Sequence, residues 1–164
     1  MRGAEIEIRR TDDIEAALAL GARAGLVEME NDIGGLAALW GAYEGQTLMG
    51  IVALCRRDGL DVVGWLAVGE SHRGRGVGTR LLSELEAEAC RRFVTCLWAT
   101  ARAPGFFLAN GYAAEDQGVE PRALLATCPE CSQYGITCTP RAVRKSLRLA
   151  SRDRGRSVGR LTAK

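Results

Sequence analysis

A glycine-rich turn between an apolar strand and an amphipathic helix constrains the fold of this chain more than any other feature of its sequence. Residues 64–68 (GWLAV) are typical of a buried strand, and Gly74, Gly76 and Gly78 follow it. A strand, a turn and a helix in this order are a unit of α/β folds, so we expect an α/β or α+β domain. The apolar residues that recur at helical spacing, and predict one stripe laid on a sheet, are Val77, Leu81, Leu82, Leu85 and Ala89.

The start of this helix is predicted to bind a phosphate group. The first turn of a helix leaves backbone N–H groups without partners, and the helix dipole favours an anion there. Glycines let the backbone approach such a ligand closely, and Arg73 and Arg75 add positive charge. A turn with a purely structural role is the alternative.

Two nucleotide-binding motifs do not fit this loop. A P-loop ends in Gly-Lys-Ser/Thr, whereas this loop ends in Gly76-Val77-Gly78-Thr79, without a lysine. A dinucleotide-binding fingerprint needs the spacing G-x-G-x-x-G and an acidic residue about 20 positions later. The spacing here is G-x-G-x-G, and residues 93–114 contain no Asp or Glu.

The rest of the pattern predicts an antiparallel meander followed by further strands and helices. Breaks at Glu44-Gly45 and Asp58-Gly59 indicate tight turns between strands. Acidic residues after Thr11 favour a helix start, and Pro104 and Gly111 are typical of the two ends of a short helix. Besides the helix that begins at 77, we expect strands at 5–9, 36–43, 47–56, 61–68, 93–100 and 141–147 and helices at 12–26 and 104–110. Residues 28–35 are expected to form a polar connection closed by glycine, with a short second helix as an alternative.

The length of 164 residues suits one domain, which we place at residues 1–150. The tail at 151–164 is basic except for Asp153 and has no hydrophobic period, so it is predicted to be disordered. A solubilising tail is the favoured interpretation, and a nucleic-acid-binding tail is the other. No apolar run approaches the roughly 20 residues needed to span a bilayer, and no signal peptide is evident, so we expect a cytoplasmic protein without a membrane partner.

The glycine loop and its neighbours resemble the GNAT (Gcn5-related) N-acetyltransferases. The acyl-CoA loop of that family is written Q/R-x-x-G-x-G/A, and here it is Arg73-Gly74-Arg75-Gly76-Val77-Gly78. Residues 64–68 resemble the strand before the loop, and residues 81–93 resemble the helix after it. Phe106 to Tyr112 is similar to the aromatic-rich helix of the family, which ends in Gly-Phe. The order of elements is similar over about residues 5–115.

The resemblance implies a fold, an activity and a cofactor site. The fold is a mixed central sheet of about six to seven strands, an antiparallel meander and then parallel splayed strands, with about four helices. The activity is acetyl transfer from acetyl-CoA to the primary amine of a small molecule. Leu66, Ala67 and Val68 would pair with the pantetheine arm, and the Val68 amide would stabilise the developing oxyanion. The other implied cofactor-binding residues are Arg73, Gly74, Arg75, Gly76, Val77, Gly78 and Thr79 at the pyrophosphate, and Asn110.

The catalytic acid and base are less defined. Many family members carry a tyrosine four residues before the glycine of the aromatic-rich motif, proposed to protonate the leaving thiolate, and this chain has Phe107 there. Tyr112 is the candidate acid nearby, although a core aromatic is the favoured interpretation of it. His72, the single histidine, abuts the loop and is the candidate base, although a solvent-facing loop residue is favoured.

The acceptor is predicted only by class. Phe106-Phe107 before Gly111-Tyr112, and the later Cys-x-Pro-x-Ala-Val stretch, resemble the amino-acid N-acetyltransferase branch, which implies an amino acid as acceptor. Glu28, Glu30 and Asp32 lie in the connection that forms the acceptor wall in this family, where they either attract an amine or are simply solvated. A non-catalytic acyl-CoA sensor and a protein N-acetyltransferase stay open as alternatives, as does a homodimer.

The six cysteines divide into two groups. Cys128, Cys131 and Cys138 form a C-x-x-C knuckle with a third cysteine after it, the only candidate metal cluster in the sequence. Structural zinc needs four ligands and this segment supplies only three cysteines, so a zinc site would need a fourth ligand from elsewhere. Free thiols are therefore the favoured interpretation, and zinc and a disulfide are the alternatives. The others stand singly in predicted elements and are expected in the core, and they are Cys55, Cys90 and Cys96.

Overall fold

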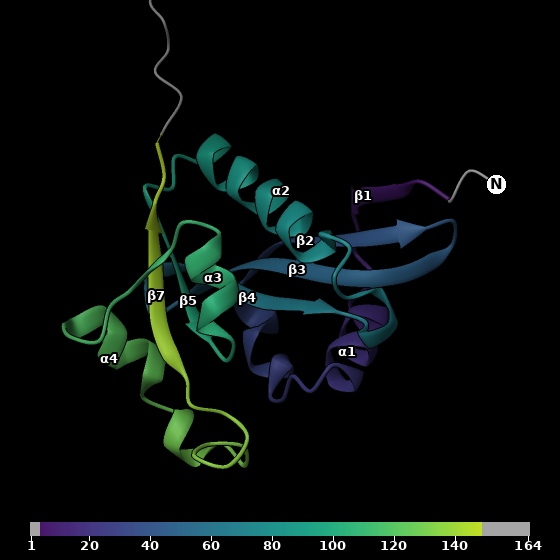
Figure 1. The fold of residues 1–164 in the computed structure, drawn as a ribbon. Coiled ribbons are helices and arrows are strands. Elements are labelled where there is room, and N and C mark those ends of the chain that lie inside the picture. The colour runs from purple at the N-terminus through teal and green to yellow at the C-terminus, as the bar shows by residue number, and fades with distance from the viewer. Residues whose placement is uncertain (1–3, 149–164) are drawn as a thin grey trace, which may run out of the picture.

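A mixed sheet of seven strands organises the structure, a computed structural model that describes residues 4–148 (Figure 1). The α/β class and the strand number expected from the sequence are confirmed, whereas the proposed domain end at 150 and the tail at 151–164 lie outside the described residues. In spatial order the strands are β1 (Ile6–Arg10), β2 (Leu36–Glu44), β3 (Thr47–Arg57), β4 (Leu60–Val68), β5 (Cys96–Ala101), β7 (Arg141–Ser146) and β6 (Ala113–Ala114).

Tight turns join the first half of the sheet, as its sequence breaks predict. Gly45 has a φ of 61°, and Asp58 and Gly59 have φ values of 51° and 77°. Both hairpins therefore turn through left-handed backbone, which glycine adopts at little cost. The strands from β1 to β4 pair antiparallel in the order in which they occur in the chain.

β4 and β5 run parallel but pair only near their starts. Over the described residues, the registered pair between them is Val62 with Trp98. The other edge of β5 is occupied by β7, in antiparallel register from Cys96–Ser146 to Ala101–Arg141. The carboxyl ends of β4 and β5 therefore separate, which confirms the expected splayed pair after the meander.

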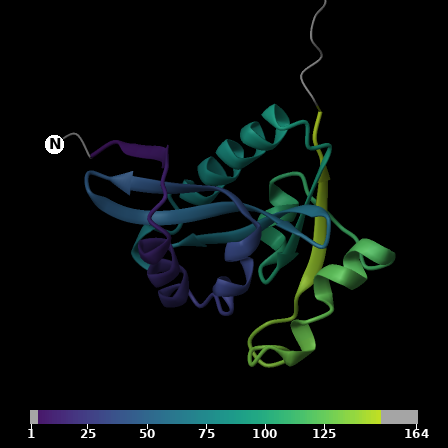
Figure 2. The same ribbon diagram turned by 180° about the vertical axis from the view of Figure 1, so that it is seen from behind.

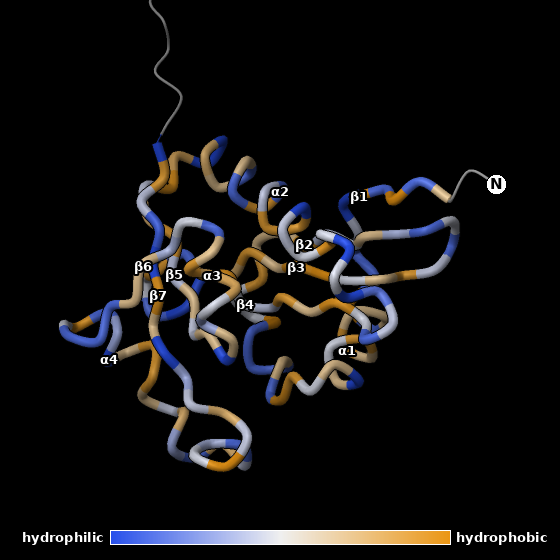
Figure 3. The backbone as a smooth tube through the Cα atoms, viewed as in Figure 1, coloured by the Kyte–Doolittle hydropathy of each residue, from blue (hydrophilic) through white to orange (hydrophobic). Residues whose placement is uncertain are grey.

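Helices cover both faces of the sheet. α2 (Val77–Arg91) and α3 (Pro104–Ala109) lie on one face, and α1 (Ile14–Arg23) lies on the other, as Figure 1 shows from one side and Figure 2 from behind. Figure 3 shows the apolar residues concentrated on the strands between these layers. Two clusters of buried side chains result, one on each face. No helix within residues 4–148 combines the length and the apolar character that crossing a bilayer requires.

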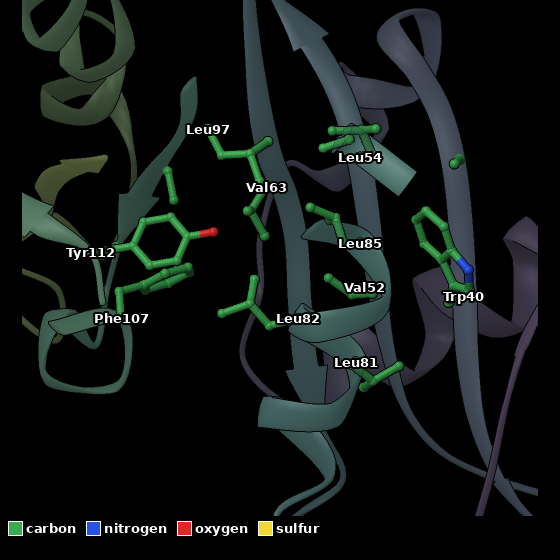
Figure 4. Packing of buried hydrophobic residues seen from close by; sticks show 14 of the residues in the cluster. Trp40, Val52, Leu54, Val63, Leu81, Leu82, Leu85, Leu97, Phe107 and Tyr112 are labelled. Carbon is green, nitrogen blue, oxygen red and sulfur yellow. The ribbon is translucent and has the colours of Figure 1, made fainter. Parts of the chain in front are cut away.

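α2 packs on the sheet as the spacing of its apolar residues predicts. In Figure 4 its leucines lie against β-strand residues, between Trp40 on one side and the ring of Phe107 on the other. Burying a leucine contributes about 1.5–3 kcal/mol to folding, so this stripe fixes the helix, and with it the glycine loop. The buried residues of α2 are Val77, Leu81, Leu82, Leu85 and Ala89.

The end of α2 differs from the prediction. The sequence predicts a strand from residue 93, but β5 begins at Cys96, and Phe93 is a turn residue with a φ of 61°. The Phe93 amide donates to the Cys90 carbonyl (3.0 Å) and the Val94 amide to the Ala89 carbonyl (2.9 Å), the paired bonds of a Schellman motif. These bonds satisfy the last carbonyls of the helix and outweigh the strand propensity of phenylalanine.

The sequence pattern missed one α-helix and left two connections undefined. α4 (Val119–Leu125) follows β6, and a 3-10 helix at Cys128–Glu130 comes after it. The polar connection before β2 is a 3-10 helix at Met29–Gly35. With α1, α2 and α3, the described residues contain four α-helices, the number expected.

Replacing Phe93 by glycine should stabilise the fold. The Phe93 side chain is 69% exposed, so its removal costs little packing. Left-handed backbone costs a residue with a Cβ about 1–2 kcal/mol. Glycine avoids this steric cost, but it loses more backbone entropy on folding, which offsets part of the gain. We expect Phe93→Gly to raise the free energy of unfolding in urea by about 0.5–1 kcal/mol. Phe93→Ala keeps the Cβ and is the control, and equal stabilisation by both variants would contradict a backbone origin.

Candidate active site

The loop between β4 and α2 presents a row of backbone amides that bind no protein acceptor within residues 4–148. A 3-10 helix at Glu70–His72 turns the chain, and Gly74 and Gly76 follow with φ values of 77° and 75°. Within residues 4–148 the amides of residues 74–79 have no protein acceptor, since the first bond of α2 runs from the Arg80 amide to the Gly76 carbonyl (3.1 Å). These amides and the positive end of the helix dipole together favour an anion.

The glycines of this loop serve different purposes. Gly74 and Gly76 need glycine for their positive φ, while space around them is open. Gly78 needs it for close packing, because a Cβ there would lie 3.3 Å from the Phe106 ring and 3.6 Å from Val68 Cγ2. α2 therefore begins close to both the end of β4 and the start of α3.

The end of β4 turns unpaired backbone groups toward β5. Arg73 Nε donates to the Val68 carbonyl (3.2 Å), whereas the next amide, that of Gly69, donates to Met49 on β3 (2.7 Å). In an antiparallel pair the N–H and C=O of one residue point to the same side, so the Val68 amide also faces away from β3. Leu66, two residues earlier in the strand, faces the same opening.

A cavity of 540 Å³, here called the strand-end cavity, lies at this opening. One wall is α3, whose Phe106 and Phe107 rings pack edge to face with centroids 5.4 Å apart. Because the walls include both the strand end and the glycine loop, an extended ligand lying along β4 would reach the row of amides. The residues that line it from β4 and the loop include Leu66, Ala67, Val68, Arg73 and Gly78.

A second cavity, of 520 Å³, adjoins the first, and we call it the cysteine-lined cavity. The register between β3 and β4 shifts at Gly64, which forms a bulge, and a Cβ on Gly64 would collide with Cys55 Sγ. Both cavities therefore meet where β4 bends and β5 ends. Their shared lining residues are Leu26, Gly64, Thr100 and Arg102.

Acidic side chains outnumber basic ones around the cysteine-lined cavity. Arg57 binds Asp32 through Nε at 3.1 Å and a terminal nitrogen at 2.5 Å, so these two charges offset each other. Arg102, at the junction of the two cavities, donates to the Gly25 carbonyl and keeps its charge unpaired within residues 4–148. The acidic lining residues without an ion-pair partner among residues 4–148 are Glu28, Asp58 and Glu130.

The two residues predicted as acid and base do not line either cavity. Tyr112 is 4% exposed, and its hydroxyl donates to Glu86 Oε1 (3.1 Å), which also accepts from Lys145. Burial and the Glu86 carboxylate raise the pKa of Tyr112, so its proton is held more tightly than in water. His72 packs against Gly69 at the loop entrance, and its buried Nδ1 has no hydrogen-bond partner among residues 4–148. Their placement favours a structural role for Tyr112.

The other predicted residues are distributed between the loop and the cavity rims. Arg75 pairs with Glu44 (3.0 Å), and Thr79 is exposed in the first turn of α2. Asn110 ends α3, with its Nδ2 donating to the Phe106 carbonyl (2.8 Å), and contact with a cofactor stays a prediction. Of the acidic residues in the connection, Glu28 and Asp32 line the cysteine-lined cavity, whereas Glu30 does not.

Sequence reasoning missed several polar residues at these cavities, among them the following three. Thr100 and Arg102 come from the end of β5 and line both cavities, and Thr137 lines the strand-end cavity from a loop far along the chain. The resemblance covers the strand that carries the first two, but nothing in their spacing marks them. Thr137 stands beside Cys138, so only the cysteine motif drew attention to its segment.

The three clustered cysteines are free thiols in this structure. Cys128, Cys131 and Cys138 are half-buried, and all of them line the cysteine-lined cavity. Within residues 4–148 no three ligating side chains are grouped closely enough to hold a metal ion. Zinc, free thiols and a disulfide all stay predictions for this segment.

Comparison with known proteins identifies the domain. Residues 35–114 match the sequence model of the acetyltransferase (GNAT) domain. No curated protein has a sequence that matches this chain significantly. The match spans β2 to β6 and so includes the splayed strands and the glycine loop.

Solved structures share the fold at low sequence identity. A GNAT acetyltransferase from Elizabethkingia anophelis with acetyl-CoA bound is 19% identical, with a TM-score of 0.64 over 87% of this chain and 98% of that one. The ribosomal-protein-S18-alanine N-acetyltransferase from Escherichia coli is 15% identical, with a TM-score of 0.65 over 91% and 98%. The N-acetylglutamate synthase from Neisseria gonorrhoeae, complexed with coenzyme A and N-acetyl-glutamate, is 20% identical, with a TM-score of 0.65 over 88% of this chain and 36% of that one.

The domain match and the fold together define the class of the protein. Residues 35–114 carry a GNAT acetyltransferase domain, the domain of acetyl-CoA-dependent acetyltransferases, and the described residues share its fold with solved structures of that class.

Tyr112→Phe should weaken the fold without removing a cofactor contact. The substitution removes the hydrogen bond to Glu86, which keeps its bonds to Lys145. We expect the free energy of unfolding to fall by about 1–2 kcal/mol, the usual worth of a hydrogen bond to a charged partner. The affinity for acetyl-CoA, measured by calorimetry, should not change. A hundredfold loss of acetyl transfer at unchanged stability would instead assign Tyr112 the role of the acid.

Proposed function

We propose that this chain transfers the acetyl group of acetyl-CoA to the primary amine of a small molecule, with an amino acid as the favoured acceptor. The observation that carries the proposal is the junction of the two cavities at Gly64, Thr100 and Arg102. A cofactor lying in the strand-end cavity would present its thioester at this junction, and an acceptor in the cysteine-lined cavity would approach it from the other side. Holding both reactants at one point supplies much of the rate in such a transfer.

The cofactor side is suited to coenzyme A by its backbone groups. The amides of residues 74–79 would hold the pyrophosphate, with Arg73 and Arg75 adding charge. The Leu66 carbonyl and the Val68 amide, which face away from β3, would pair with the amide groups of the pantetheine arm, whereas the Val68 carbonyl already accepts from Arg73 Nε (3.2 Å). Leu66 lies nearer than Val68 to the junction at Gly64, so the Leu66 amide is better placed than the Val68 amide, which the family resemblance implied, to donate to the thioester oxygen as negative charge develops there.

The acceptor side is suited to a molecule with an amine and a carboxylate. An amino acid carries the two groups on one carbon, so a carboxylate at Arg102 would leave the amine at the junction. The unpaired Glu28 and its acidic neighbours around the cavity would attract the protonated amine and accept its proton, through water, before attack. The acidic lining also suits a second positive group on the acceptor.

Among residues 4–148, no tyrosine lines the strand-end cavity to assist the departure of the CoA thiolate. Phe107 lines the strand-end cavity where the family resemblance implies a proton donor. A CoA thiol leaves tolerably near neutral pH, and an absent acid–base group costs about 10²- to 10⁴-fold. The presence of Phe107 at this position also favours the second candidate function, an acyl-CoA sensor without turnover.

A panel of amine acceptors tests the proposal and separates the two candidates. The purified chain is mixed with acetyl-CoA and single acceptors (amino acids, polyamines, aryl amines and peptides with free N-termini), and free CoA thiol is measured. Acceptor-dependent thiol release with amino acids supports the enzyme. Binding of acetyl-CoA without thiol release from any acceptor supports the sensor. Release only with peptides would replace the small-molecule acceptor by a protein.

A charge placed at Gly76 should abolish CoA binding. Gly76 lies in left-handed backbone at the start of α2, where the pyrophosphate would bind. Gly76→Asp adds a negative charge there, whereas Gly76→Asn adds a neutral side chain of the same size that tolerates this backbone. We expect calorimetry with CoA to show no heat for the Asp variant and at most a tenfold weaker Kd, about 1.4 kcal/mol, for the Asn variant. Equal CoA binding by the two variants would contradict the prediction that the pyrophosphate binds at this loop.

Arg102→Gln should discriminate between acceptors. If Arg102 binds the acceptor carboxylate, its loss should raise the KM for an amino acid by about 10- to 100-fold, the worth of a charged hydrogen bond. The matched control is the corresponding amine without the carboxylate, whose KM should not change. A similar loss with both acceptors would indicate a structural role for the bond from Arg102 to Gly25.

A further inference from the structure

Three of the six thiols of the chain lie in one wall, and acetyl transfer uses none of them. Cys128, Cys131 and Cys138 line the cysteine-lined cavity, where each is half-buried. The remaining thiols are not among its lining residues: Cys55 is buried in β3, and burial raises its pKa to about 12. Cys90 lies on α2, which covers the opposite face of the sheet from α1.

The backbone of the segment brings two of these thiols together. Cys128 begins a 3-10 helix, and the Cys131 amide donates to the Cys128 carbonyl (3.0 Å). Side chains three residues apart eclipse each other in a 3-10 turn, so the two thiols lie on the same side. The negative charges that Cys138 and Cys131 carry when ionised add to burial in raising the pKa of Cys128, as expected for neighbouring sulfur atoms.

The segment is anchored on both sides of this turn. Before it, Leu124 of α4 is 2% exposed, and its carbonyl accepts from the Thr100 hydroxyl (3.4 Å). After it, Gln133 Nε2 donates to the Gly25 carbonyl (3.0 Å), and the Gln133 carbonyl accepts from the amides of residues 136–138. A new covalent bond between the anchors would therefore reshape the cavity wall rather than displace the whole segment.

We propose that Cys128 and Cys131 are a dithiol site that forms a reversible disulfide and thereby changes acceptor binding. One thiolate attacks a small-molecule disulfide, such as oxidised glutathione, forms a mixed disulfide and releases one small thiol. The second protein thiolate then displaces the other small thiol. Two protein thiols are oxidised and one small disulfide is reduced to two thiols, so protons and electrons balance.

The oxidised wall has a consequence for acetyl transfer that rests on the proposed function. The bond replaces two separate thiols by one apolar link between neighbouring residues of the acceptor wall. The strand-end cavity is lined by neither cysteine, so the acetyl-CoA side is untouched. Oxidation should therefore change the KM for the amine and leave the affinity for acetyl-CoA unchanged.

Redox titration of the full chain tests the disulfide without any assay of activity. The reduced protein is equilibrated in buffers of graded reduced and oxidised glutathione, free thiols are alkylated, and peptides are mapped by mass. We expect a link between Cys128 and Cys131, retained in Cys138→Ser and in the control Cys90→Ser, and lost in Cys131→Ser. Absence of a link in fully oxidising buffer, or a link of Cys128 to Cys138, would overturn the proposal. Stoichiometric zinc in protein purified without added metal would also overturn it.

The effect on the acceptor is measured on the same oxidised and reduced samples. We expect a several-fold change in the KM for the amine, with an equal thermal shift by acetyl-CoA in both states. Cys131→Ser should show the same KM in oxidising and in reducing buffer, whatever KM the substitution itself produces. An unchanged KM in a sample with the mapped disulfide would overturn the effect on acceptor binding. Absence of turnover in both samples would instead contradict the proposed function. It would leave the disulfide proposal unaffected, because peptide mapping tests the disulfide independently of activity.

Discussion

The separation of β4 from β5 beyond the pair Val62–Trp98 is the constraint on which both cavities depend. Val62 and Trp98 pair near the strand starts and are buried in the same cluster, while β7 occupies the far edge of β5. The bulge at Gly64 then redirects β4. Backbone groups that a closed sheet would pair are left free, and an isolated protein tolerates this only where water or a ligand satisfies them.

The two cavities use different parts of the chain for recognition. The strand-end cavity is built mainly from backbone groups and glycines within one continuous stretch, from β4 into α2. The cysteine-lined cavity takes its charges from separate segments, with Asp32 before β2, Arg57 at the end of β3 and Glu130 after α4. Backbone recognition suits a ligand common to a whole family, whereas side chains from loops allow the second ligand to differ between members.

Local patterns in the sequence predict much of the cofactor half and little of the acceptor half. The stripe on α2 and the turn at Asp58-Gly59 depend on neighbours in the chain, so periodicity and turn chemistry were sufficient. The start of β5 was misplaced because the Schellman bonds at Phe93 override its strand propensity. The position of Thr137 at the strand-end cavity depends on the path of the whole segment after β6, which no local pattern encodes.

One carbonyl shows how this later segment is joined to the rest. The Gly25 oxygen accepts hydrogen bonds from Arg102 and from Gln133, which are 77 and 108 residues away along the chain. Contacts of such long sequence separation form only after the intervening chain has been organised, because loop closure must come first. The acceptor wall is therefore expected to be the last part of the domain to assemble and, by the same reasoning, among the first to open in the folded protein.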